Sequence, residues 1–536
     1  MISISKILLY INTVRYLKPV QIFARGLLYF RKAFPYRQDW SQYSSLTPQK
    51  LTFIDSIYSI TSNSGTSFEF LNLKKNFEEQ IDWNFFAYGR LWMYNLNYFE
   101  YLNQKGISSD EGVQLIDNFI FHLPNMKIGM EPYPLSLRCI NWIRFFIKHK
   151  IHNAKFDSIL FNQLNLLTHK LEYHLLGNHL LENGFALLFG AYYFNERKLY
   201  IKAKKILVFQ LEEQILPDGG HFELSPMYHC TMLFRLLDCY NLISNNKQFD
   251  MELKLLFKEK CELMLAWLNN IKFKNGNIPL MNDSAFNIAP NHKDLIDYAL
   301  RLELDIYKKV ELNHSGYRKF INNKFELLVD VGSIGPDYQP GHAHADTFTF
   351  ELYVNNKPIV VDTGTSTYIP GKRRKWERGT TAHNTTSING DDSAEVWGSH
   401  RVARRPEVFF VEDNDKNLHA FHNGYRKYNL YHRRVFNIRN FKEIQIIDSI
   451  EAIKNFEDFS FSNLDINTRF HFHPDVEVEL DGINLSINGN IKISFTGSKD
   501  VSMHDYFYAP EFNKLIKAKF IQVEFSDQLI SHIVFE

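Results

Sequence analysis

Four short segments of the sequence gather side chains that could transfer protons or bind charged groups. In the first, NHLLEN at residues 178–183, His179 and Glu182 stand three residues apart inside a helical pattern. One helical turn would place both on the same face, with Asn178 beside them. The segment fits a polar site. Taken alone, it fits better a helix end that satisfies its own hydrogen bonds by capping and i,i+3 pairing.

The second segment is PDGGHFELSPMYH at residues 217–229. A glycine-rich bend carries His221 and Glu223, and a Ser-Pro pair then begins a helix that carries Tyr228 and His229. So many hydrogen-bonding side chains around one turn are unusual for a connector. A functional turn and a capped helix start with a packed tyrosine are equally good interpretations.

The third segment is GHAHADTFTFELY at residues 341–353, which leads into a predicted β-hairpin. His342 and His344 alternate with alanine, so on an extended strand they point the same way. Asp362 lies on the expected return strand, and His383 follows in TTAHNTT. Two imidazoles and a carboxylate suit a zinc-like divalent ion, which the pattern favours over a purely hydrogen-bonded trio.

The fourth segment is basic and aromatic, beginning with GKRRKWERGTTAHN at residues 371–384. The formal net charge of the chain is only +1, so no overall field would attract a polyanion or a nucleic acid. This local patch is either a solvated loop or a rim that faces a polyanion, because arginine forks match carboxylate and sulfate geometry. Its cationic and aromatic members include Trp376, Arg378, Trp397, Arg401, Arg404 and Arg405.

The elements that must position these segments divide the chain in two. Residues from about 40 to 310 repeat apolar side chains at spacings of three and four, which predicts helical hairpins arranged as a toroid or solenoid. From about residue 318, short β-branched and aromatic runs end in turn signals such as Asn389-Gly390. We therefore expect a multidomain α+β protein with a basic N-terminal segment at 1–40, an α/α toroid at 41–315 and an antiparallel β-sandwich at 316–536.

The N-terminal segment is cationic and only moderately apolar. The apolar run at residues 7–11 is short, no small-residue cleavage site follows it, and no stretch is long enough to span a membrane. We expect a first helix packed on the protein, with an amphipathic segment lying on a membrane surface as the alternative. Its basic residues are Lys6, Arg15, Lys18, Arg25, Arg31 and Lys32.

Taken together, these segments resemble the heparinase II/III-like polysaccharide lyases. NHLLEN, PDGGHFELSPMYH, GHAHADTFTFEL, VDTGTSTY and TTAHNTT occur in that family's order, over roughly residues 80–420. The resemblance implies an α/α toroid followed by an antiparallel β-sandwich, in agreement with the periodicity. It also implies β-elimination in an acidic, uronic-acid-containing polysaccharide, with an unsaturated uronate end as product.

This reaction gives each residue type a purpose. The C5 proton of a uronate can be removed only if the adjacent carboxylate is neutralised, because the intermediate is an enolate-like dianion. By resemblance, Asn178, His179 and Glu182 handle the carboxylate, and Glu182 can do so only if burial keeps it protonated. Tyr228 matches the catalytic tyrosine of the family, as acid alone or as both base and acid, and His342 matches its catalytic histidine.

The resemblance also assigns a structural divalent metal, zinc in the first place, to His344, Asp362 and His383, where it would hold the loop in place. No organic cofactor and no nucleic acid partner is expected. We further expect seven side chains to bind the glycan: Tyr94, Arg138, Trp142, His229, Arg378, Trp397 and Arg404.

Two other functions remain open at this point. A glycoside hydrolase could use Glu182 and Glu223 as its carboxylate pair, but Tyr228 and His342 would then lack a purpose. A non-catalytic glycan-binding or biosynthetic accessory protein would bind without turnover. The family favours the periplasm or cell envelope, whereas the poor signal peptide leaves the cytoplasm open. The basic N-terminal segment is similar to that of relatives associated with bacterial exopolysaccharide or surface-polysaccharide production.

Overall fold

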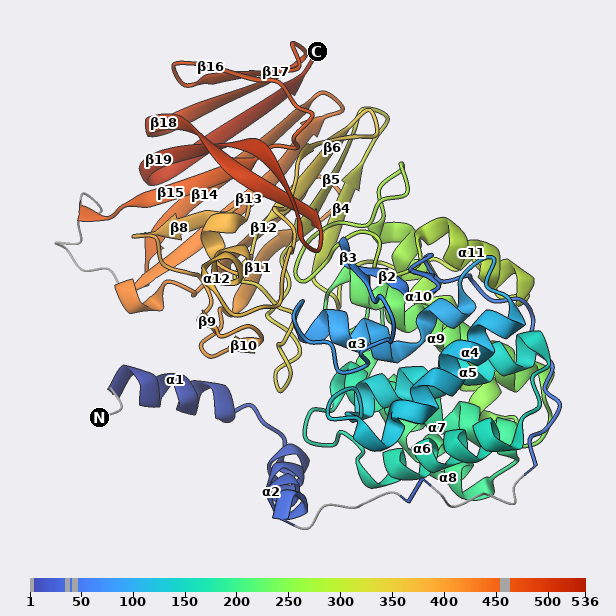
Figure 1. Ribbon diagram of the computed structural model, residues 1–536. Helices are drawn as coiled ribbons and strands as arrows, with labels where there is room; N and C mark the ends of the chain where they lie inside the picture. The colour runs from blue at the N-terminus through green and yellow to red at the C-terminus, as the bar shows by residue number, and fades with distance from the viewer. Residues whose placement is uncertain (1–3, 34–38, 41–46, 454–462) are drawn as a thin grey trace.

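The computed structural model describes residues 4–33, 39–40, 47–453 and 463–536, and a helical part and a β-sheet part lie side by side in it (Figure 1). The chain begins with α1 (Ile4–Val14) and α2 (Pro19–Ala33). In Figure 1, α1 lies apart from the other helices. Of the expected basic segment, residues 1–3 and 34–38 and the side chains of Arg31 and Lys32 fall outside the described residues. No described helix is both long and apolar enough to cross a membrane.

The helical part is built from consecutive helices that pack against each other, most extensively α7 against α8, with α5 against α7 and α9 against α10. A small antiparallel sheet, β1 (Asn63–Ser64), β2 (Ser67–Phe70) and β3 (Leu73–Asn76), precedes them. The helices are α3 (Arg90–Tyr98), α4 (Ser109–His122), α5 (Pro132–His149), α6 (Ala154–His169), α7 (Gly177–Phe194), α8 (Arg197–Gln214), α9 (Pro226–Asn245), α10 (Glu252–Ile271) and α11 (His292–Arg301).

Local sequence determines where these helices begin. Ser108 and Glu111 form a capping box on α4, and Ser225 caps α9, whose first residue is a proline. In α7, every residue except His179 is buried, as expected for a helix that is apolar on all sides and lies inside the domain. His179 is therefore the most exposed residue of α7.

The β-sheet part consists of two antiparallel sheets. One has the order β4-β5-β6-β7, and the other runs β11-β12-β13-β14-β19-β18-β17-β16, with β15 joining β19 to β8. A helix, α12 (Lys372–Glu377), and the short pair β9 (Val396–Trp397) and β10 (Arg401–Val402) lie in the connections. The remaining strands are β4 (Tyr317–Ile321), β5 (Phe325–Asp330), β6 (Phe350–Val354), β7 (Lys357–Val360), β8 (Thr386–Ile388), β11 (Val408–Asp413), β12 (Asn417–His422), β13 (Leu430–Asn440), β14 (Glu443–Ala452), β15 (Ile466–His471), β16 (Val478–Asp481), β17 (Asn484–Ile487), β18 (Ile491–Glu511) and β19 (Lys514–Phe535).

The sandwich core lies between these two sheets. Burial alternates along β13 and β14, so one face of the large sheet is apolar and packed. Phe350 and Leu352 of β6 belong to the same buried cluster as Phe436 of β13 and Ile446 of β14. Side chains from the two sheets thus share one core.

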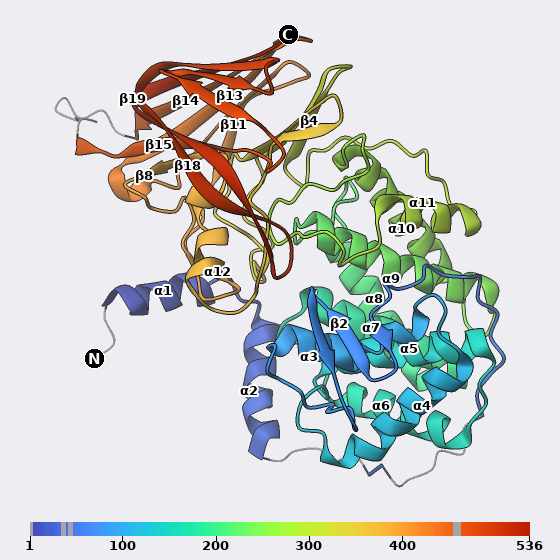
Figure 2. The same ribbon diagram turned by 45° about the horizontal axis from the view of Figure 1, so that its top comes forward.

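Contacts at several places join the helical part to the sandwich. The long β18–β19 hairpin points its tip at the helices (Figure 2), where Phe512 joins Met227 in a buried cluster. Asp218, in the glycine-rich bend before α9, accepts hydrogen bonds from the backbone and hydroxyl of Ser315, both at 2.7 Å. In the same bend Gly219 has a φ of +88°, and a Cβ there would lie 2.1 Å from the Leu263 carbonyl, so this bend requires glycine.

Candidate active site

A cleft of about 2030 Å³ lies between the helical part, the sandwich and the two N-terminal helices. All five residues predicted to be catalytic line it: Asn178, His179, Glu182, Tyr228 and His342. The first four come from the starts of α7 and α9, and His342 comes from the loop between β5 and β6. The fold therefore brings together residues that are up to 164 positions apart in the sequence (178 to 342).

Tyr228 and His342 form the centre of the site. Their rings are stacked, with centroids 3.8 Å apart and planes 29° from parallel. The Tyr228 hydroxyl lies 3.2 Å from the hydroxyl of Tyr368, which lies in the segment after β7. Burial raises the pKa of Tyr228 well above its usual value, although the hydrogen bond with Tyr368 partly opposes this. Tyr228 is therefore protonated at neutral pH and can donate a proton.

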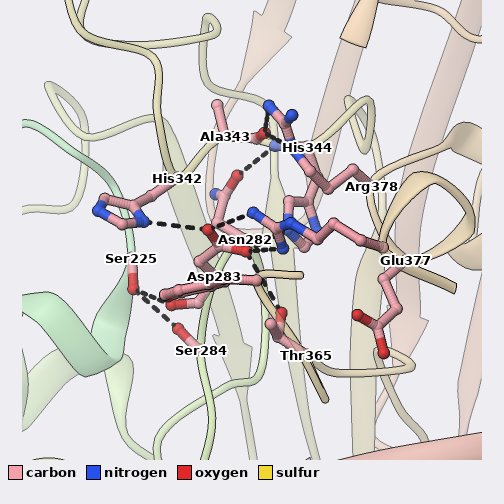
Figure 3. A network of polar contacts seen from close by, with 12 residues as sticks. Ser225, Asn282, Asp283, Ser284, His342, Ala343, His344, Thr365, Glu377 and Arg378 are labelled. Carbon is pink, nitrogen blue, oxygen red and sulfur yellow. Dashed lines mark hydrogen bonds and ion pairs between the residues drawn. The ribbon is translucent and has the colours of Figure 1, made fainter. Parts of the chain in front are cut away.

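Asp283 organises the sandwich side of this centre (Figure 3). Its carboxylate accepts hydrogen bonds from His342 Nδ1 at 3.0 Å, His344 Nε2 at 2.8 Å and Arg374 Nη2 at 2.7 Å. Burial alone would raise the pKa of Asp283, but Arg374 and the two imidazoles hold it well below its usual range. Because Nδ1 of His342 donates to this carboxylate, its Nε2 carries the lone pair and can accept a proton.

The backbone of Asp283 links both parts of the protein. Its carbonyl accepts a hydrogen bond of 2.7 Å from the hydroxyl of Ser225, the residue that caps α9. Its N–H donates to the carbonyl of His342 at 3.0 Å. One residue thus fixes both the helix start that carries Tyr228 and the loop that carries His342.

Glu223 lies between this centre and the start of α7. One carboxylate oxygen is 3.6 Å from His342 Nε2, and the group accepts from the backbone N–H and the side-chain amide of Asn178 at 3.2 and 3.4 Å. Burial raises the pKa of Glu223. The predicted carboxylate-handling residues are thereby placed next to the predicted catalytic pair.

His179 and Glu182 have the protonation behaviour that neutralising a carboxylate requires. His179 is 31% exposed in the cleft, and its Nδ1 lies 3.1 Å from Glu172. Burial would lower the pKa of His179, but Glu172, Glu223 and Glu182 together raise it. Burial raises the pKa of Glu182 to about 7, against the opposing effect of Arg235, whose Nε is 3.4 Å away.

Asp283, Arg374, Tyr368 and Arg235 were not singled out individually from the sequence. Arg235 follows Tyr228 by seven residues on α9, a spacing that places both on one helix face and could have identified it. Tyr368 ends the VDTGTSTY motif, and Arg374 belongs to the basic run. Asp283 has no sequence signal, since only the fold brings it to His342.

The proposed metal site has a buried group of ligand atoms. His344, Asp346 and His383 offer atoms within 4.8 Å of one another. In each residue one buried atom has no hydrogen-bond partner: His344 Nδ1, Asp346 Oδ2 and His383 Nε2. Asp362 instead accepts a hydrogen bond of 2.7 Å from His383 Nδ1. Two imidazoles and a carboxylate fit a divalent ion, but Asp346 takes the ligand position expected for Asp362, which orients His383.

Two residues expected to bind glycan from the helical part are instead core residues. Arg138 is completely buried and donates to Gln163 at 2.6 Å and to the backbone carbonyls of Asn97 and Gly129. Trp142 is also completely buried and packs edge-on against Phe99. The prediction was wrong for both, because neighbouring helices cover the face of α5 that carries these two side chains and they do not line the cleft.

His229 and Arg378 are buried as well, which corrects the same expectation. His229 Nε2 lies 3.0 Å from the carbonyl of Met264, and its ring packs on Trp267. Arg378 donates to the carbonyl of Ala343 at 2.9 Å. Both therefore support the fold around the site, and Arg378 holds the loop that carries His342.

The three remaining glycan-binding predictions differ in position. Tyr94 and Trp397 line the cleft. Arg404 is exposed and pairs with Glu395 at 3.1 Å, and it does not line the cleft, whereas its neighbours Arg401 and Arg405 do. The basic patch thus faces the cleft through other members than Arg404.

A helical toroid and an antiparallel sandwich that share one cleft define a class of fold, and comparison with known proteins identifies the family. The Heparinase II/III N-terminus model matches residues 135–302, and the Heparinase II/III-like C-terminal model matches residues 307–533. The chain belongs to the heparinase II/III-like family.

Similar proteins include two named heparin-sulfate lyases. The one from Pedobacter heparinus is 23% identical over 335 residues, covering 57% of this chain and 49% of that protein. The one from Bacteroides stercoris is 24% identical over 255 residues, covering 41% of this chain and 38% of that protein. The matches thus span about half or less of the length of these curated relatives.

Two solved structures have the same fold. A heparinase III gives a TM-score of 0.69 at 16% identity, covering 96% of this chain and 91% of that one. A heparan sulfate lyase from Pedobacter heparinus gives a TM-score of 0.54 at 17% identity, covering 88% of this chain and 81% of that one. The predicted fold class, an α/α toroid followed by an antiparallel β-sandwich, is confirmed.

Proposed function

We propose that this protein is a polysaccharide lyase that cleaves a uronic-acid-containing polysaccharide by β-elimination. The observation that carries the proposal is the stacked pair of Tyr228 and His342, with the imidazole oriented by Asp283. A protonated phenol and an imidazole with a free Nε2 are the acid and the base that elimination needs. Family membership supports the same reaction class.

The uronate carboxylate would bind at the start of α7. The side-chain amide of Asn178, the imidazole of His179 and the protonated carboxyl of Glu182 can each stabilise the negative charge that develops when C5 loses its proton. The pKa of Glu182, raised to about 7 by burial, keeps a large fraction of this carboxyl protonated at neutral pH.

The proton transfers start from Tyr228 with its proton and His342 with a lone pair on Nε2. His342 Nε2 takes the C5 proton, the bond from C4 to the glycosidic oxygen breaks, and a C4–C5 double bond forms. The Tyr228 hydroxyl gives its proton to the leaving oxygen. Return of the proton from His342 to Tyr228, whose rings are in contact, restores the site.

We also propose that His344, Asp346 and His383 hold a divalent ion, zinc in the first place. The ion would add a fixed positive charge and would link the loop between β5 and β6, through His344 and Asp346, to His383 before β8. This would keep His342 in position next to Asp283, and no step of the elimination requires the ion itself.

A screen of acidic polysaccharides, including heparan sulfate, chondroitin and alginate, tests the function. We expect ultraviolet absorbance from the unsaturated uronate to increase with at least one polymer. Tyr228→Phe should reduce the rate by about 10²–10⁴-fold while binding persists. New reducing ends without this absorbance would identify a hydrolase and contradict the proposal.

We further propose that α1 and α2 rest on an anionic membrane surface. Residues 1–38 contain seven lysines and arginines and no acidic residue. Large apolar side chains on these helices are exposed and do not line the cleft: Ile7, Leu8, Ile11, Ile22, Phe23 and Phe30. A basic helix pair with an exposed apolar face is typical of interfacial helices.

Sedimentation with vesicles tests this location. We expect binding to vesicles that contain phosphatidylglycerol and weaker binding to pure phosphatidylcholine. Phe23→Ser combined with Phe30→Ser should weaken binding, whereas Phe121→Ser, which changes an equally exposed phenylalanine on α4, should not. Equal binding of all variants would contradict the proposal.

A further inference from the structure

The two N-terminal helices form one wall of the cleft, although both precede the residues that the family models match. Thr13 and Leu17, at and just after the end of α1, and Arg25 and Tyr29, one turn apart on α2, line the cleft. Figure 2 shows α1 below the sandwich and α2 beside the helical part. This wall is therefore a feature that the family models do not describe.

The wall is attached to both parts of the protein. Trp397 Nε1, on β9, donates to Thr13 Oγ1 at 3.1 Å. Gln21, which is completely buried, donates to the carbonyl of Leu175 just before α7 at 3.0 Å. Lys18 pairs with Glu213 of α8. These contacts give the cleft-facing side chains of α2 a defined position.

Two arginines from different elements, Arg25 and Arg401, line this cleft. Arg25 projects from α2 and is partly buried, and Arg401 projects from β10 with its guanidinium 4.6 Å from the centre of the Trp397 ring. In the described parts of the chain neither guanidinium forms an ion pair with a carboxylate. Burial and the charge of Arg401 both lower the pKa of Arg25, and Arg25 in turn contributes to lowering the pKa of His174.

An anion bound between the two guanidinium groups would neutralise their charge. Two like charges that face one space without a counter-ion destabilise each other, and an oxyanion between them removes that cost. Guanidinium groups also match the planar geometry of carboxylates and the oxygens of sulfates. Within the described residues, neither arginine makes a hydrogen bond, ion pair or ring contact with Tyr228 or His342, and we therefore place the anion on another sugar than the one that loses its proton.

We propose that Arg25 and Arg401 form an anion-binding subsite, in which the N-terminal helices hold an acidic group on a neighbouring sugar of the polysaccharide. The group is a carboxylate or a sulfate. The inference rests on the proposed function for its substrate class, but binding can be measured whether or not the chain turns the polymer over.

The test compares Arg25→Gln, Arg401→Gln and the double variant on a long acidic polymer and on its shortest cleavable oligosaccharide. Each single change should raise KM for the polymer about tenfold with kcat unchanged. A tenfold change corresponds to the lower end of the free energy that a hydrogen bond to a charged group contributes. KM for the short substrate should not change. The double variant should lose less than the product of the single effects, because both arginines hold one anion.

Arg404→Gln is the matched control, since it removes the same charge from the same segment but outside the cleft. A sulfated polymer and its desulfated form identify the group: a KM effect on both indicates a carboxylate, and an effect on the sulfated form alone indicates a sulfate. Both results support the subsite.

Direct binding separates this inference from the proposed function. In the Tyr228→Phe background, the Kd for the same polymers should rise about tenfold with Arg25→Gln even if no turnover is ever seen. Unchanged KM and Kd in the double variant would overturn the subsite. An equal effect on polymer and short substrate, or a loss of kcat, would also overturn it, since it would indicate a general structural change.

Discussion

The helical part and the sandwich supply the site in different ways. Asn178 and Tyr228 lie in the first turns of α7 and α9, where the helices themselves, and in α9 also the Ser225 cap, fix their direction. His342 and His344 lie in a loop before β6, where no regular element holds them. Asp283, Arg374 and Arg378 perform that task through hydrogen bonds.

The difference shows where the site is vulnerable. A side chain on a helix start loses only its own contribution when it is changed. A loop that depends on a buried carboxylate loses its geometry when that carboxylate is changed, because two imidazoles and a guanidinium share it. The loop side should therefore be more sensitive to substitutions outside the catalytic pair.

Asp283→Asn is expected to have the largest effect. It leaves the buried guanidinium of Arg374 without its charge partner and removes the acceptor that orients His342. We expect a loss of about 3–5 kcal/mol in the free energy of unfolding and loss of measurable turnover. Chemical denaturation and product absorbance measure both. Wild-type stability in this variant would mean that the loop is held by other contacts.

Loss of the metal should have the next largest effect. It should also show whether Asp346 or Asp362 is the metal ligand. Asp346→Asn removes a proposed ligand, whereas Asp362→Asn only weakens the orientation of His383. Metal content of the purified protein should fall further with Asp346→Asn, while Asp362→Asn should reduce affinity about 10–100-fold. Chelator should lower the Tm of the wild type and not that of Asp346→Asn. The reverse order of the two variants would restore Asp362 as the ligand.

On the helical side, Glu182 should give an alkaline limit to activity. Its pKa lies near 7, set by burial against Arg235, with Glu100 and His179 also nearby. In the proposed mechanism the neutral form of Glu182 is the active one, so kcat/KM should fall about tenfold per pH unit above 7. Glu182→Gln, which is neutral at every pH, should remove this fall of kcat/KM at alkaline pH.

The same shift affects stability. Because the pKa of Glu182 is raised in the folded state, its contribution to stability is complete below the usual carboxyl range and is lost as pH rises through about 7. The stability of the wild type relative to Glu182→Gln should therefore decrease as pH rises from 5 to 8. A constant difference across this range would assign the fall of kcat/KM at alkaline pH to another group.

Arg404→Gln should have the smallest effect. The side chain is 45% exposed and pairs only with Glu395 on the surface. We expect a stability change below about 1 kcal/mol and unchanged kinetics. A large rise in KM would show that the polysaccharide extends beyond the cleft onto this face.

The sequence was sufficient for the two parts of the fold and for the residues inside motifs. Helical spacing and turn signals are local, and Asn178, Glu182, Tyr228 and His342 stand in recognisable segments that the fold then places in one cleft. The failures are long-range. Arg138 and Trp142 look like groove residues until packing of neighbouring helices buries residues 134–146 of α5.

The roles of Asp346 and Asp283 could not be predicted from the sequence, because they depend on contacts made only in the folded chain. Asp346 is two residues from His344, but only its placement against His383 distinguishes it from Asp362. Asp283 lies in a loop without a motif, and its importance arises from five side-chain partners distributed over 150 residues of sequence, from Ser225 to Arg374. Burial and partner identity of this kind depend on the folded chain.

The contact made by Asp283 has a consequence for how such proteins can be recombined. The carboxylate belongs to the helical part, and the groups that neutralise it belong to the sandwich. The buried charge of Asp283 is not neutralised within the helical part alone, and the buried charge of Arg374 is not neutralised within the sandwich alone. The two parts therefore depend on each other for their stability. A chimera that joins the toroid of one relative to the sandwich of another would have to carry both halves of this contact to remain folded.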